Sequence, residues 1–73
     1  MPKLPVIRPK ELAKALQLTG FLITRKTGSH LRFRHPDGRA TTISIHQRTI
    51  PKGTLNAILH QTKLTAEQLR KLL

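Results

Sequence analysis

A chain of 73 residues without cysteine is long enough for one small domain, and it has no disulfide framework, zinc knuckle or thiol chemistry. Aromatic residues make up 3%, so we expect an aliphatic core with little room for a deep pocket or a buried cofactor. Fourteen lysines and arginines and only three acids give a net charge of +11. This charge is typical of a protein that binds nucleic acid or an acidic protein. No apolar run exceeds three residues, which predicts a cytoplasmic protein without a membrane partner.

The first periodic segment predicts a helix over residues 9–19. Pro9 suits the first turn of a helix, where its missing N–H group leaves no hydrogen bond unmade. Leu12 and Leu16 then recur at helical spacing. Gly20 is expected just past the helix, in the left-handed conformation that closes many helices.

Three strands are predicted next, over residues 21–26, 30–35 and 39–46. The first and third are rich in β-forming residues, and the second alternates apolar and polar side chains. Residues 27–29 form the turn between the first two strands. Residues 36–38, Pro-Asp-Gly, are a strong turn signal, because proline presets φ and glycine supplies a positive φ. The second and third strands are therefore expected to form a hairpin.

Two further helices complete the expected fold. A polar loop over residues 47–53 leads into a helix over residues 54–61 with apolar residues at helical spacing. Thr65 and Gln68 fit a capping box, which starts a short final helix. The order predicts a single α+β domain over residues 1–73, α-β-β-β-α, with a three-stranded antiparallel sheet and helices on one face.

Side-chain alternation separates the two faces of this sheet. Leu31 and Phe33 share one face of the second strand, which we expect to turn toward the helices. His30, Arg32 and Arg34 share the other face and are therefore expected in solvent.

The turn also predicts how the second and third strands pair. A type I turn closed by a glycine bulge leaves a three-residue loop, and pairing outward from it sets His30 opposite Ser44. Leu31 then opposes Ile43 on the core face, a pairing that a slip of one residue would break. His46 becomes the diagonal neighbour of His30. The predicted open face carries two imidazoles among cationic and hydroxyl side chains: His30, Arg32, Arg34, Thr42, Ser44 and His46.

This face suits the cleavage of RNA, which carries its own nucleophile in the 2′-hydroxyl. The reaction needs a general base for that hydroxyl, a general acid for the leaving 5′-oxygen and positive charge near the phosphate. Histidine titrates near neutrality and serves either role, which indicates His30 and, with less support, His46. Arginine binds phosphate through bidentate, permanently charged contacts, so the chemistry needs no metal ion or other cofactor. The candidate RNA contacts are Arg25, Lys26, Ser29, Arg32, Arg34 and Ser44.

Simpler interpretations of the same residues stay open. An exposed histidine on a basic sheet is more often a surface residue than a catalytic one, and neighbouring arginines are more often a solvated face. His35, beside the turn, is expected to be structural, and His60 is expected on the surface of a helix. The histidines have no acidic companion at metal-ligand spacing, so no metal site is predicted.

Several short motifs follow one another along the chain in a definite order. They are Gly20-Phe21, Arg25 to Gly28, Gly28-Ser29-His30, Phe33, the His35 to Gly38 turn, a strand ending at His46, Gly53-Thr54-Leu55 and Ile58-Leu59. This order resembles the HicA toxins of bacterial and archaeal HicAB toxin–antitoxin systems, and the similarity covers about residues 8–70. Two positions depart from the family's pattern: Ser44-Ile45-His46 stands where Val-Pro-x-His is common, and Lys63 stands where glycine often precedes the leucine.

The resemblance implies a fold similar to the double-stranded-RNA-binding domain and activity as an mRNA interferase, a toxin that cleaves mRNA and stops translation. It implies that His30, in the Gly-Ser-His motif, is catalytic and that a HicB-type antitoxin binds the toxin and blocks this site. A non-catalytic double-stranded-RNA-binding module is an alternative, although the lysine-rich helix start of such modules is reduced here to Lys52. A toxin that has lost activity and keeps antitoxin binding and autoregulation is a third reading.

Overall fold

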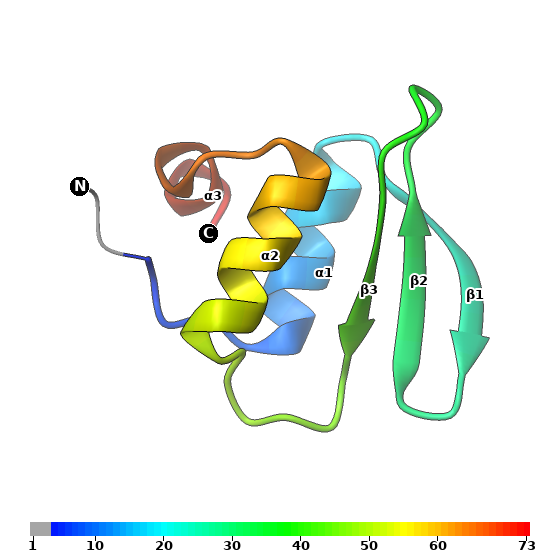
Figure 1. Ribbon diagram of the computed structural model, residues 1–73, viewed down its shortest axis with the longest axis horizontal. Helices are drawn as coiled ribbons and strands as arrows, with labels where there is room; N and C mark the ends of the chain where they lie inside the picture. The colour runs from blue at the N-terminus through cyan, green and yellow to red at the C-terminus, as the bar shows by residue number, and fades with distance from the viewer. Residues whose placement is uncertain (1–3) are drawn as a thin grey trace.

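The computed structural model describes residues 4–73, which fold into a three-stranded sheet and three helices (Figure 1). The elements are α1 (Pro9–Leu18), β1 (Leu22–Thr27), β2 (His30–Arg34), β3 (Ala40–Ser44), α2 (Lys52–Thr62) and α3 (Ala66–Leu72). The sheet is antiparallel with the strand order β1-β2-β3. Both α1 and α2 pack against β3, and Figure 1 shows them on one side of the sheet. The predicted α+β architecture is therefore confirmed.

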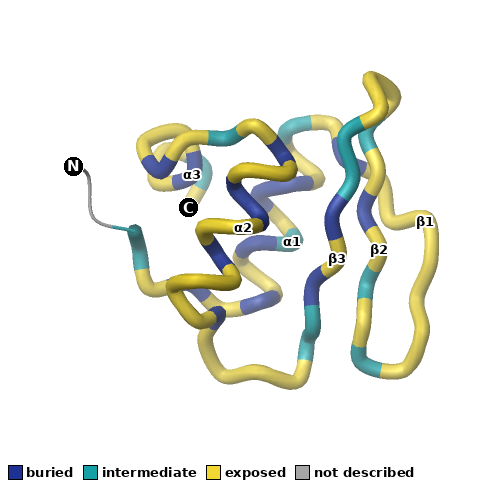
Figure 2. Tube along the Cα trace, in the orientation of Figure 1, coloured by how far each residue is buried: buried dark blue, intermediate teal, exposed yellow. Residues whose placement is uncertain are grey.

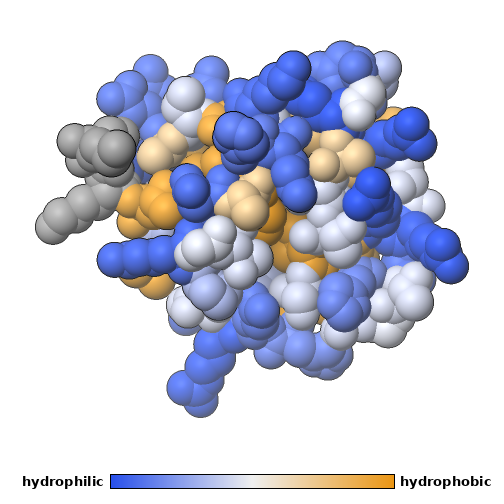
Figure 3. Space-filling model, in the orientation of Figure 1, coloured by the Kyte–Doolittle hydropathy of each residue, from blue (hydrophilic) through white to orange (hydrophobic). Residues whose placement is uncertain are grey.

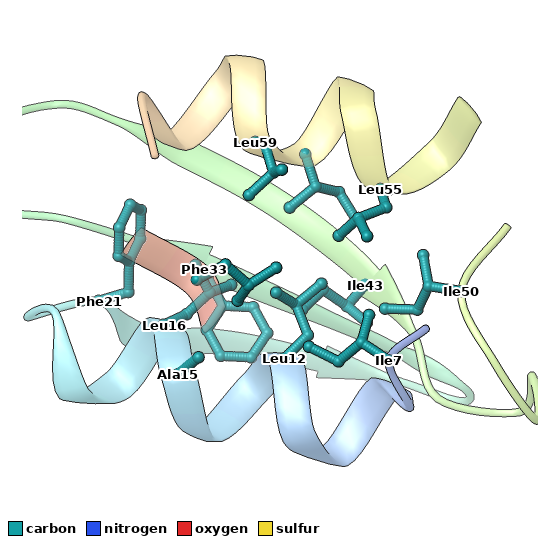
Figure 4. Packing of buried hydrophobic residues seen from close by; sticks show 12 residues of the cluster. Ile7, Leu12, Ala15, Leu16, Phe21, Phe33, Ile43, Ile50, Leu55 and Leu59 are labelled. Atoms are coloured by element: carbon teal, nitrogen blue, oxygen red, sulfur yellow. The ribbon is translucent and has the colours of Figure 1, made fainter. Parts of the chain in front are cut away.

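The core lies between the two long helices and the inner face of the sheet. Figure 4 shows Phe33 of β2 and Ile43 of β3 between the apolar side chains of α1 and α2. Both phenylalanines of the chain are buried, with Phe21 1% and Phe33 0% exposed. Burying one such side chain stabilises the fold by about 1.5–3 kcal/mol. The buried apolar cluster also contains Ile7, Leu12, Ala15, Leu16, Ile50, Leu55, Ile58, Leu59 and Leu69.

Strand β1 lies at the edge of the sheet, beyond the layer of helices (Figure 2). All six of its residues are exposed. Figure 2 shows that burial is concentrated in β3, in the middle of β2 and along the inner sides of the helices. Strand β1 therefore projects into solvent, where both of its faces are accessible.

Helix α1 ends at Leu18, one residue before the end of the predicted range, and backbone hydrogen bonds close it. The Gly20 N–H donates to the Gln17 carbonyl at 3.1 Å, and the Phe21 N–H donates to the Leu16 carbonyl at 3.0 Å. These two bonds form a Schellman motif, which requires a left-handed residue. Gly20 supplies it with a φ of +97°, as the sequence predicts. Phe21, predicted to start the first strand, instead points into the core before β1 begins.

The β2–β3 register is the predicted one, with His30 opposite Ser44 at the far end of the ladder. The predicted strand over residues 39–46 is too long at both ends. Strand β3 stops at Ser44 because its partner β2 starts at His30. One further backbone bond, from the Ile45 N–H to the Ser29 carbonyl at 2.7 Å, joins the two chain segments beyond the ladder.

His35, the last residue of the strand predicted over residues 30–35, lies just after β2, which ends at Arg34. It is structural, as expected. Its N–H donates to the Arg39 carbonyl at 2.8 Å, which closes the hairpin. Its Nε2 lies 3.2 Å from the Thr19 carbonyl, at the end of α1. Its ring packs edge-on against Phe21, with the ring centroids 5.1 Å apart. The imidazole therefore joins the hairpin to the end of α1.

Asp37 and Arg39 hold the tip of this hairpin. The Arg39 backbone N–H donates to Asp37 Oδ1 at 3.1 Å, and Arg39 Nε donates to Oδ2 at 2.8 Å. The backbone hydrogen bond lowers the pKa of the Asp37 carboxyl most, and the guanidinium acts in the same direction. Arg39 also donates through Nη1 to the carbonyl of Thr62 and so ties the hairpin to the end of α2.

Helix α2 starts at Lys52, before the predicted range of residues 54–61. Pro51 is the N-cap in an extended conformation, and its carbonyl accepts the Leu55 N–H at 2.8 Å. Gly53 therefore lies in the first helical turn and not in a loop. This start was missed because proline before a helix caps it through backbone geometry alone, without the side-chain signal of serine, threonine or aspartate.

Helix α3 begins with the predicted capping box. The Gln68 N–H donates to Thr65 Oγ1 at 3.1 Å, and the Thr65 N–H donates to Gln68 Oε1 at 2.9 Å. Leu69 of this helix is buried in the core. Among residues 4–73 no helix combines the length and the apolar character needed to cross a membrane.

Candidate active site on the open face of the sheet

The open face is the side of the sheet that points away from the helices, and its side chains form three rows across the strands. Residues paired on neighbouring strands share a face, so the strand pairs define the rows. The histidine row is Thr27, His30 and Ser44; the arginine row is Arg25, Arg32 and Thr42; the outer row is Leu22, Arg34 and Ala40. Successive rows lie about 6.6 Å apart, because two residues of β2 separate them.

A β-bulge in β1 decides which of its side chains reach the open face. The register shifts at Thr24, which has no partner of its own on β2. Leu22 and Arg25 are three positions apart and would point to opposite sides of a regular strand. The extra residue brings both onto the open face, opposite Arg34 and Arg32 respectively.

The histidine and arginine rows border a shallow hollow of about 330 Å³. Its lining residues are Arg25, Thr27, His30, Arg32 and Thr42. Arg32 Nη1 donates to Thr42 Oγ1 at 3.0 Å, which orients the guanidinium beside the hollow. The imidazole of His30 is exposed there and accessible to a ligand.

The charge on this face is positive and uncompensated. Arg25 and Arg32 are directly opposed on neighbouring strands, an arrangement that is destabilising for like charges. The three acids of the chain lie elsewhere: Glu11 in α1, Asp37 at the hairpin tip and Glu67 in α3. Figure 3 shows hydrophilic side chains over the end of the molecule that carries β1 and β2. A bound anion such as a phosphate would relieve the repulsion between the two arginines.

The other predicted RNA contacts are spread around this hollow. Lys26 is exposed but pairs with Leu31, so it points to the opposite side of β1 from His30. Ser29 is half-buried in the turn between β1 and β2. Arg34 lies in the outer row, and Ser44 is half-buried opposite His30. The hollow thus gathers His30 with Arg25 and Arg32, while the remaining contacts lie beside it or on the other face.

His46 lies in the turn that follows β3 and is exposed. The diagonal pairing with His30, predicted from a longer strand, does not form because the ladder ends at Ser44. His46 is not one of the residues that line the hollow. The Ile45–Ser29 backbone bond nevertheless holds its turn next to the turn that precedes His30.

Thr27 lines the hollow and was not predicted. It pairs with His30 across a two-residue turn, Gly28-Ser29, in which Gly28 has a φ of +54°. A positive φ at the first central position is the requirement of a type II′ hairpin turn. The Gly-Ser dipeptide between two strand patterns was the available signal, since a two-residue turn would have set Thr27 opposite His30.

A larger hollow of about 460 Å³ lies between the start of α1 and the residues Ile45, Gln47 and Arg48, and no histidine is among its lining residues. Glu11 at its edge is engaged in capping, because its Oε1 accepts the Arg8 N–H at 3.0 Å. This hollow has no side chain that titrates near neutral pH, so the smaller one is the candidate site. Within residues 4–73 no group of three or more histidine, cysteine or acidic side chains could hold a metal ion.

A family model described as the HicA toxin of bacterial toxin–antitoxin systems matches residues 9–64. The chain belongs to the HicA toxin family. The matched segment runs from the start of α1 to just past α2, so it contains all three rows of the open face. No match was found among the curated proteins. As a HicA toxin, the protein is one member of a toxin–antitoxin pair, and an antitoxin partner is implied.

Proposed function

We propose that this HicA toxin is an endoribonuclease that cleaves mRNA and inhibits translation in the cytoplasm, with His30 as general acid and base and without a metal ion. The observation that carries the proposal is the hollow in which His30 lies beside Arg25 and Arg32. A titratable imidazole next to two fixed cations matches the needs of phosphodiester cleavage by a 2′-hydroxyl. Membership of a family of RNase toxins supports the same activity.

In the proposed reaction, neutral His30 takes the proton of the 2′-hydroxyl. The 2′-oxygen forms a bond to phosphorus, and the bond between phosphorus and the 5′-oxygen of the next nucleotide breaks. The imidazolium then gives a proton to that 5′-oxygen, so His30 returns to its neutral form. The products are a 2′,3′-cyclic phosphate and a free 5′-hydroxyl. A positioned general acid–base of this kind contributes a rate factor of about 10²–10⁴.

The arginines act on the phosphate in this proposal. Arg25 and Arg32 contact its non-bridging oxygens, whose negative charge grows in the transition state. Arg34, one row further and about 6.6 Å away, would contact the RNA next to that phosphate. Ser29 and Ser44 flank His30 as further RNA contacts, and Lys26 would contact RNA that passes over the free edge of β1.

His46 is the second proposed proton-transfer group or phosphate contact. Its support is the Ile45–Ser29 bond, which keeps the turn that carries it next to the turn before His30. A His46→Ala variant is expected to lose activity in part. Full cleavage activity in this variant would reduce His46 to a surface residue and leave the proposal for His30 unchanged.

Incubation with single-stranded RNA in EDTA tests the proposed activity. The expected result is cleavage to products with 2′,3′-cyclic phosphate and 5′-hydroxyl ends. A matched RNA with one 2′-deoxy nucleotide at a mapped cleavage position should resist cleavage at that position only, because it lacks the nucleophile. RNA that stays intact but bound would favour the non-catalytic RNA-binding module instead. Cleavage at the 2′-deoxy position would exclude the 2′-hydroxyl mechanism.

We also propose that the partner is a HicB-type antitoxin that covers the open face. The supporting observation is the uncompensated positive charge of that face, which suits an acidic surface. The cognate antitoxin is then expected to stop RNA cleavage in proportion to complex formation, and RNA and antitoxin are expected to compete for the toxin.

A further inference from the structure

A second hollow, of about 250 Å³, lies beside the outer row of the open face, at the turn between β2 and β3. It has a different chemical character, because its lining combines aliphatic and ring carbons with one guanidinium. The lining residues are Leu22, Thr24, Arg34, His35, Pro36 and Gly38. His35 is already engaged with Thr19 and Phe21, so Leu22, Pro36 and Arg34 supply most of the surface that a ligand would meet.

Leu22 is the large apolar side chain of the three rows. It is 63% exposed, and with Ala40 it is one of two aliphatic side chains in the three rows of the open face. The bulge at Thr24 is what puts Leu22 on the side of Arg25 and not on the opposite side. The bulge thus places a leucine side chain on the same face as Arg25 and Arg34, where it offers a ligand an apolar contact.

We propose that this second hollow binds a nucleobase of the RNA strand whose phosphate lies between Arg25 and Arg32. The inference rests on the proposed function and adds a base-binding subsite to it. A base presents an apolar face to Leu22 and Pro36, and Arg34 can stack on it or donate to its edge. The arginine row and the outer row are only about 6.6 Å apart, so one RNA strand can reach both hollows at the same time.

The rest of the open face has few apolar side chains. Proteins usually hold unstacked bases against aromatic side chains, and this chain has no tryptophan or tyrosine. Its two phenylalanines, Phe21 and Phe33, are buried in the core. The patch formed by Leu22 and Pro36 therefore offers a base an aliphatic surface outside the hollow that holds His30, and it should favour some bases over others.

The test measures RNA binding without relying on cleavage. The four 2′-O-methyl homopolymer oligonucleotides lack the nucleophile and share one backbone, so the differences among their affinities report the contribution of the bases. Wild type is expected to bind the best and the poorest of the four with affinities that differ about threefold or more, and Leu22→Ser should reduce that ratio to about twofold or less. Leu18→Ser is the matched control, because Leu18 is 61% exposed in α1 and lies outside the three rows. Circular dichroism verifies that both variants are folded.

Two results would overturn the subsite. One is a wild type that binds all four homopolymers equally, and the other is a Leu22→Ser variant whose ratio equals that of Leu18→Ser. A Leu22→Ser variant that keeps its base preference but loses affinity for the antitoxin would assign the hollow to the protein partner instead. These readouts do not depend on catalysis, so a toxin that binds RNA and fails to cleave it would refute the proposed function without refuting the subsite.

Discussion

Arg32 lies at the centre of the positively charged open face. It pairs with Arg25 on β1, its guanidinium donates to Thr42 on β3, and it is two residues from His30 on β2. Two opposed guanidinium groups without an acid between them carry a Coulombic penalty in the free protein. A phosphate removes that penalty on binding, so Arg32 should contribute to both RNA affinity and the transition state.

An Arg32→Gln substitution tests this role. We expect KM for RNA to rise about tenfold, and the slope of log affinity against log salt to fall by about 0.7, the value for one phosphate contact on a single strand. Lys71→Gln is the matched control, because it removes the same charge from α3, away from the open face. Equal changes in the two variants would show that only net charge matters and that Arg32 has no specific contact.

At this scale the sequence located part of the site. Alternation and the Pro-Asp-Gly turn were enough to put His30, Arg32 and Arg34 on one face, because both signals are local and the register confirmed them. The same reasoning could not place Leu22 and Arg25 relative to each other. They share a face because of the bulge, and no residue type in β1 predicts a bulge at that position.

Among the structural elements, the connection from α1 to β1 is the one that most constrains the sequence. Gly20 has a φ of +97°, and a Cβ atom added there would lie 2.9 Å from His35 Nε2. His35 in turn joins the hairpin to α1 and packs on Phe21. The sequence predicted the C-terminus of α1 to within one residue and the N-terminus of α3, because a motif of neighbouring residues forms each of them. The Pro51 cap of α2 has no comparable sequence signal.

A pair of glycine substitutions tests this connection. Gly20→Ala should destabilise the fold by about 1–3 kcal/mol, because a left-handed alanine is strained and the His35 ring must move. Gly53→Ala should instead stabilise it by about 0.5–1 kcal/mol, because Gly53 lies in the first turn of α2 with open space around it. Urea denaturation measures both. A Gly20→Ala variant as stable as wild type would contradict the role given to Gly20.

The whole molecule combines a small aliphatic core with a net charge of +11. Self-repulsion of this size destabilises the compact state and favours binding of polyanions. Sequence composition revealed this balance directly, since charge is additive along the chain. It could not reveal that β1 extends past the helices, which depends on how α1 and α2 pack on β3 (Figure 2).

Salt should therefore act on the protein in two opposite directions. Raising NaCl from 20 to 300 mM is expected to raise Tm by several degrees, because screening weakens the repulsion among the cationic side chains. The same change should weaken RNA binding, because phosphate contacts release counterions. Thermal melts followed by circular dichroism measure the first effect. A Tm that falls with NaCl would show that ion pairs outweigh repulsion in this fold.

The measurement that tests the central claim most directly is the RNA cleavage rate of His30→Ala in EDTA, compared with wild type and with His60→Ala. His60 is an exposed histidine of α2, outside the sheet, and controls for the loss of an imidazole. We predict that His30→Ala keeps its fold, binds RNA within about threefold of wild type and loses at least about 100-fold in kcat/KM, the lower bound for a general acid–base. A His30→Ala rate within twofold of wild type would contradict the proposed mechanism.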